Sequence, residues 1–195
     1  MFRNSSIKTA PELPATTLAS NCYRNMFQGC TSLTSAPALP ATTLANSCYN
    51  SMFNFSTSLT SAPALPAKTL APGCYSNMFN GCTSLTQAPA LLATTLAINC
   101  CSNMFNNCSS LTQAPALPAT TLVERCYSRM FQECTSLSSI SASFTEWTSD
   151  TTTDWVTNIR SSGTFYCPTA LGTNETITRG NNNCPTNWTV VNTDA

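Results

Sequence analysis

Hydrophobic and polar residues follow each other in blocks along this chain, and the same blocks return with a period of about 26 residues. On a helical wheel at about 100° per residue, the leucine, alanine, cysteine, tyrosine, methionine and phenylalanine of residues 43–53 (TLANSCYNSMF) fill one half. Asparagine and serine fill the other half. This pattern predicts an amphipathic helix in each repeat, with the preceding threonine as its N-cap. The copies of the block begin at Thr17, Thr43, Thr69, Thr95 and Thr121.

The segment between two of these blocks combines leucine with proline. Residues 32–36, with Leu33 and Ala36 as their apolar positions, are predicted to form a short strand, which has to stop at Pro37 because proline donates no hydrogen bond to a sheet. A second proline, Pro40, stiffens the following link. A single unit cannot bury its own apolar face, so the units are expected to stack. The sequence therefore predicts an α/β repeat solenoid of the leucine-rich-repeat type, with short parallel strands on one side and short helices on the other. The repeat methionines should form one buried column: Met26, Met52, Met78, Met104 and Met130.

The repeat spacing is lost after Ile140, where acidic residues and tryptophans appear. We therefore divide the chain into a solenoid, residues 1–139 with a truncated first repeat, and a C-terminal capping segment, residues 140–195. Within the cap, residues 150–159 are expected to form a helix, and residues 164–167 and 188–191 the two strands of a hairpin. Because Met1 and Phe2 align with the middle of a repeat, we expect a piece of a longer protein. The alternative is translation starting at a repeat methionine.

Charge and composition limit the possible functions. Only 8% of the residues are charged, the net charge is zero and histidine is absent. A nucleic-acid partner is not expected, because phosphate binding needs lysine and arginine. Without histidine, the commonest general base and imidazole metal ligand are missing. No run approaches 18 apolar residues, so membrane insertion is not expected either. The carboxylates are expected to be caps and solvated residues, and the threonine columns caps rather than an ice-binding face. We expect no enzyme activity, no cofactor and no metal.

Ten of the twelve cysteines lie at or beside repeat positions. Zinc sites need closely spaced pairs of cysteines, whereas two cysteines within one repeat are eight residues apart. Equivalent residues of a stack all point the same way and cannot pair completely, so the repeat cysteines are expected to be buried free thiols. Cys167 and Cys184 differ, because they flank the loop of the tail and each precedes a proline. They are the candidates for a disulfide.

The repeat resembles the BspA-like leucine-rich repeats of bacterial surface proteins, in their longer cysteine-containing form. The residues that carry the resemblance are MFQGCTSLT, LPATTLA and the CYxxMF block, together with DWVTNIRSSGTFY and CPTNWTVVN in the tail. The resemblance implies an extracellular or cell-surface binding or adhesion module rather than an enzyme, although the N-terminus shows no secretion signal. Two departures are the prolines that replace the usual asparagine after the strand, and the cysteine pair Cys167 and Cys184.

A partner is expected to bind where side chains point outward from the strands. These positions form an uncharged, hydrogen-bonding stripe that suits a protein or a glycan on another cell or matrix. The alternative is a structural spacer or display element, such as a cell-surface stalk or a virus fibre, without a ligand of its own. Near-identical repeats favour the spacer, and the oligomeric state is left open. The expected binding residues are Thr34, Ser35, Thr60, Ser61, Thr86, Gln87, Thr112 and Gln113.

Overall fold

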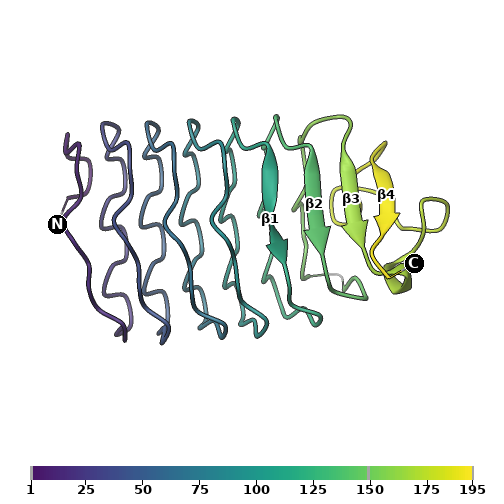
Figure 1. Cartoon of the computed structure of the whole chain (residues 1–195), viewed down its shortest axis with the longest axis horizontal. Coiled ribbons are helices and arrows are strands. Elements are labelled where there is room, and N and C mark those ends of the chain that lie inside the picture. Colours follow the sequence, from purple (N-terminus) through teal and green to yellow (C-terminus); the bar gives the residue numbers. More distant parts are fainter. Residues whose placement is uncertain (1, 149, 195) are drawn as a thin grey trace.

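The computed structural model describes residues 2–148 and 150–194 and shows a row of similar coils stacked along one axis (Figure 1). Each coil has an extended segment on one side and a segment of turns on the other. Near the C-terminal end the extended segments become a regular parallel sheet, in the order β1-β2-β3-β4. The elements are β1 (Gln113–Leu117), β2 (Ser139–Ala142), β3 (Thr164–Cys167), the 3-10 helix η1 (Thr169–Leu171) and β4 (Thr189–Asn192).

The prediction of an α/β solenoid with short helices was wrong, because the described residues contain no α-helix. The apolar block of each repeat forms a chain of consecutive turns instead. The N–H of Met52 donates to the carbonyl of Tyr49 in its own coil, at 3.1 Å. The next N–H, that of Phe53, donates to Met78 of the following coil at 2.9 Å. Successive backbone N–H groups thus donate in turn to a carbonyl of their own coil and to one of the neighbouring coil. In an α-helix all of these bonds would be local, and in a strand they would all go to neighbouring strands.

The turns arise because about every fourth residue of the block has a positive φ. In one coil these residues are Ser47, Ser51 and Phe55, with φ of 53°, 54° and 58°. A left-handed residue ends an α-helix, and glycine and asparagine tolerate this conformation best. Both types recur at these positions in three other coils: Asn21, Asn25 and Gly29; Gly73, Asn77 and Gly81; Asn99, Asn103 and Asn107. In the coil after these, Arg125, Arg129 and Glu133 adopt the same conformation, with φ of 52°, 52° and 62°.

Stacking distances give a second reason for turns. Rungs of a sheet are about 4.8 Å apart, whereas packed helices are about 8–10 Å apart. The phenylalanine rings on the turn side stack nearly parallel from Phe2 to Phe131, with centroids 5.5–5.9 Å apart. This spacing is close to that of strands, so both sides of each coil advance by similar steps. The predicted burial of the methionine column is confirmed: Met26 is 8% exposed, and Met52, Met78, Met104 and Met130 are 0% exposed.

The tail continues the stack and does not form a hairpin. β3 and β4 are parallel neighbours, so the expected hairpin of residues 164–167 and 188–191 was wrong. Thr164 and Thr189 align with Ser139 of β2, which makes each coil of the tail one residue shorter than the coils before it. The expected helix of residues 150–159 was also wrong: these residues form turns, and Trp155 accepts a hydrogen bond of 2.9 Å from Phe131 N–H.

Proline does not end the extended segments as we expected. β1 passes through Pro115, which the sheet accommodates by a shift of register between Gln113 and Ala116. A bulge of this kind leaves a residue without a ladder hydrogen bond, so the missing N–H of proline costs nothing there. In earlier coils the extended segments pair only at isolated bridges, such as that between Leu65 and Leu91.

Candidate interaction surface

All eight residues of the expected binding surface are exposed and lie on the extended side of the coils. Ser35 pairs with Ser61 and Ser61 with Gln87 through parallel bridges, and Gln113 pairs with Ser139 of β2. The structure therefore brings these residues together in two adjacent rows that run along the stack. We call this surface the polar stripe: Thr34, Ser35, Thr60, Ser61, Thr86, Gln87, Thr112 and Gln113.

Hydrogen bonds between coils hold two of the four threonines of the polar stripe, Thr60 and Thr112. The N–H and the hydroxyl of Thr60 both donate to the carbonyl of Thr34, each at 3.1 Å. Thr112 makes the same two bonds to Thr86, each at 3.4 Å. Because each of these hydroxyl protons is held by the preceding coil, the oxygen lone pairs of these hydroxyls remain to accept from a partner. Thr60 and Thr112 are consequently oriented acceptors in the stripe, and Gln87 and Gln113 add exposed amide groups that also donate.

An apolar surface lies beside the polar stripe, and the sequence interpretation missed it. Burial alternates along residues 90–93: Ala90 and Leu92 are exposed, whereas Leu91 and Ala93 are buried. The same outward positions hold alanine and proline in other coils, and the tail places larger side chains in line with them. Alternation over A-L-P-A was the available signal, but we interpreted the prolines only as strand breakers. We call this surface the apolar lane: Ala38, Pro40, Ala64, Pro66, Ala90, Leu92, Ala116, Pro118, Ser141, Tyr166 and Val191.

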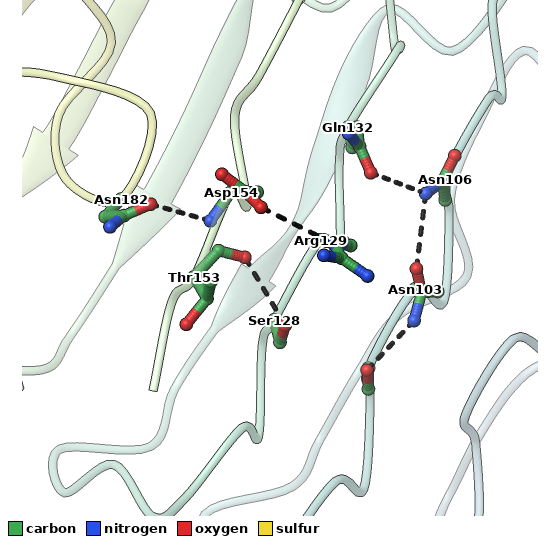
Figure 2. A network of polar contacts seen from close by, with 9 residues as sticks. Asn103, Asn106, Ser128, Arg129, Gln132, Thr153, Asp154 and Asn182 are labelled. Atoms are coloured by element: carbon green, nitrogen blue, oxygen red, sulfur yellow. Dashed lines mark hydrogen bonds and ion pairs between the residues drawn. The ribbon is translucent and has the colours of Figure 1, made fainter. Parts of the chain in front are cut away.

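Charged side chains gather on the opposite, turn side, towards the C-terminal end (Figure 2). Arg129 Nε lies 3.5 Å from Asp154 Oδ2, and the two side chains are 52% and 38% exposed. Around them, asparagine and glutamine amides bond from coil to coil; Asn106 Nδ2, for example, donates to Gln132 Oε1 at 3.0 Å. An exposed pair of this kind contributes little to stability, about 0–1 kcal/mol. The network links the outer surfaces of neighbouring turns.

One cysteine column has a role that the sequence did not indicate. Cys82, Cys108 and Cys134 each donate their S–H to a phenylalanine carbonyl of the preceding coil, at 3.0–3.1 Å. Ser56 stands at the same position of one coil and donates its hydroxyl to Phe27 at 2.8 Å. The four carbonyls are those of Phe27, Phe53, Phe79 and Phe105. This column therefore ties each coil to the one before it.

Burial makes these thiols weak nucleophiles. Removal from water raises the pKa of Cys82 and of Cys134 to about 12, against an ordinary value of 9.0. Burial likewise raises the pKa of Cys48, in the other column, to about 11. A thiol reacts and binds metals as the thiolate, so these cysteines are unreactive near neutral pH. In the described part of the chain, no three cysteine or carboxylate side chains converge as metal ligands.

Cys167 and Cys184 are both buried and carry free thiols in the structure. Burial raises the pKa of each to about 11. The guanidinium of Arg179 lies 3.7 Å from the sulfur of Cys184, an opposing influence that favours its thiolate. The disulfide between them stays a prediction.

The end of the stack is closed by the loop that carries Cys184. Thr152 and Trp155 donate side-chain hydrogen bonds to the carbonyls of Asn182 and Asn183, at 2.7 and 2.8 Å. The loop thus covers Trp155, which follows Phe131 in the aromatic column of the turn side and is 0% exposed.

Residues 2–148 and 150–194 include no helix of the length and apolar character that crossing a bilayer requires. Comparison with protein-family models, with curated proteins and with solved structures found no match to this chain. The resemblance to BspA-like repeats therefore stays an expectation based on the quoted motifs.

Proposed function

We propose that this protein is a non-enzymatic recognition module, displayed outside the cell, that holds a protein or glycan partner through the polar stripe. The observation that carries the proposal is the placement of all eight stripe residues on one face, in register from coil to coil. Each coil offers the same few weak polar contacts. A partner with repeated groups gains affinity when several coils engage it at once.

The chemistry of the face fits an uncharged or weakly charged partner. Stripe residues are threonine, serine and glutamine, and Lys68 is the single charged residue between Arg24 and Glu124. Hydroxyl and amide groups match the hydroxyls of a glycan and the peptide groups of a protein. The extracellular location rests on the resemblance to surface repeats.

The test replaces Thr60, Gln87 and Gln113 together with lysine and measures retention on immobilised matrix glycoproteins and glycans. All three side chains are exposed, so the core should be unaffected. A matched control adds the same charge on the turn side, by lysine at the exposed residues Ser20, Asn46 and Ile98. Loss of retention in the stripe variant alone supports the proposal, and equal retention of both variants and the wild type contradicts it.

A spacer without a ligand is the second candidate, favoured by the near-identical coils and their regular stacking (Figure 1). It predicts that the wild-type protein is retained on none of the immobilised partners.

A further inference from the structure

We infer that the apolar lane is a self-association surface, on which a second copy of this chain packs face to face with its stack running in the opposite direction. The lane lies beside the polar stripe on the same side of the coils, and the inference concerns a different partner from the one proposed for the stripe. It rests on three properties of the lane: its exposure to solvent, its apolar side chains, and the hollows and projections along its surface.

The lane is exposed and unusually apolar for an outer surface. Leu92, Tyr166 and Val191 are 48%, 38% and 40% exposed, and they are three of the five large hydrophobic residues exposed in the described chain. Tyr166 and Val191 are register partners in β3 and β4, and Ser141 and Ala116 extend the same row. Continuing by repeat spacing, the row reaches Ala90, Ala64, Ala38 and Glu12. Glu12, at one end, is the only charged member of the row.

The relief of the lane differs between its two ends. At the N-terminal end, shallow grooves lie between neighbouring coils, lined mainly by proline and alanine, with Glu12 also lining the first. One is lined by Pro11, Pro14, Pro37, Ala38 and Pro40, and the next by Ala36, Pro40, Pro63, Ala64 and Pro66, among others. At the C-terminal end, the large side chains of Tyr166 and Val191 project. One end therefore offers hollows and the other offers projections.

A two-fold axis parallel to the strands matches these ends to each other. The rotation reverses the direction of the stack but keeps each position along the strand, so lane faces lane. Tyr166 of each copy then lies opposite Ala38 and its proline grooves in the other copy, and Ala116 lies opposite Ala90. Both copies have nearly the same distance between rungs, so the match continues along the row. A surface that is complementary to itself under rotation is the condition for a closed dimer.

The contact area of such a dimer is also large enough for a stable interface. The contact face is eight rungs long, at about 4.8 Å per rung, and roughly 23 Å wide, which is the length of extended chain from the polar stripe to the second proline. A face of these dimensions would bury about 800 Å² of surface on each copy. That area is typical of one side of a stable interface. It includes the polar stripe, which would face its counterpart, so dimerisation would compete with any partner that the stripe holds.

The test is sedimentation velocity of the full chain over a concentration series. Wild type should show a monomer–dimer equilibrium, and Tyr166→Lys and Ala38→Glu should each weaken it at least about tenfold, because each introduces an unpaired charge into an apolar contact. Mixing the two variants should restore dimers, because the two-fold axis places the introduced ammonium opposite the introduced carboxylate. Asn46→Lys and Asn46→Glu, on the turn side, are the charge-matched controls and should associate like wild type.

Three results would overturn the inference: a wild type that stays monomeric at every concentration, variants that associate like wild type, or a mixture that stays monomeric. Circular dichroism and melting temperatures confirm that each variant is folded, and Tyr166→Ser is the substitute if the lysine variant does not fold. Retention of the monomeric variants on glycoproteins reports on the polar stripe separately, so either proposal can fail alone.

Discussion

Replacing Cys108 by alanine should destabilise the protein more than replacing it by serine. The thiol is fully buried and donates to the carbonyl of Phe79 at 3.1 Å. That carbonyl also accepts the N–H of Cys82 at 3.0 Å, so alanine removes one of its two donors. The lost hydrogen bond is worth about 0.5–1.5 kcal/mol, and the lost sulfur leaves a small cavity that adds about 1 kcal/mol. We expect Cys108→Ala to lose about 2 kcal/mol in total, as the sum of these two effects.

Serine should keep most of that stability, because Ser56 already makes the same bond at 2.8 Å two positions earlier in the same column. We expect Cys108→Ser to lose less than about 1 kcal/mol. The opposite order follows if the column consists only of small hydrophobic side chains, as its sequence suggests. Alanine would then be tolerated, and a buried hydroxyl would be the costlier change.

Urea unfolding followed by circular dichroism measures the difference. Repeat stacks can unfold in more than one step, so midpoint and slope are compared together. The reciprocal pair Ser56→Cys and Ser56→Ala is the internal control, because it should show the same order at an independent coil. If the alanine variants are as stable as the serine forms at both positions, the column does not act through its hydrogen bond.

Four further outcomes are expected. Leu85→Ala should lose about 2–5 kcal/mol in urea melts, because Leu85 is 0% exposed; a loss below about 0.5 kcal/mol would contradict its place in the core. Asn103→Ala should be about 1 kcal/mol less stable than Asn103→Gly, because φ at Asn103 is 55°; equal urea midpoints would remove the left-handed turn as the cause. Burial raises the pKa of Cys82 and Cys134 from 9.0 to about 12, so the stability that these two neutral thiols contribute is complete below pH 9 and is lost as the pH rises towards 12. Melting temperatures that do not fall between about pH 9 and 11 would contradict this contribution. Alkylation under denaturing, non-reducing conditions should leave only Cys167 and Cys184 unlabelled, and labelling of all twelve cysteines would exclude their disulfide.

The repeat made the burial pattern predictable but not the backbone. Leu44, Cys48 and Met52 are four residues apart, and this spacing fits both a helix of about 3.6 residues per turn and a chain of four-residue turns. The helical wheel separates apolar from polar side chains and carries no information on backbone conformation. The residues that decide between the two structures are on the polar half, where asparagine and glycine recur at Asn99, Asn103 and Gly73. We interpreted them as a solvated face, whereas they supply the left-handed conformations that a helix excludes.

The tail was mispredicted because a small change of spacing hid its repeat. Ser139, Thr164 and Thr189 are aligned in the sheet, and the interval between them is one residue shorter than the interval from Gln113 to Ser139. Two strands with a polar loop between them suggested a hairpin, because local pairing is the simpler expectation. Trp155, which continues the aromatic stack of Phe131 with centroids 6.0 Å apart, was the available sign of another coil.

Polar stripe positions were predictable from the sequence, whereas the shape of the face was not. In a stack of strands and helices, the helices take more room than the strands, so the strand side curves inward. Here turns replace helices, and the ring spacing of 5.5–5.9 Å on the turn side is near the spacing expected for strands. We therefore expect the extended side to stay nearly flat along the row of coils. A flat face encloses no small ligand, but it can contact a long partner or another flat face along many rungs at once, which is what both proposed interactions require.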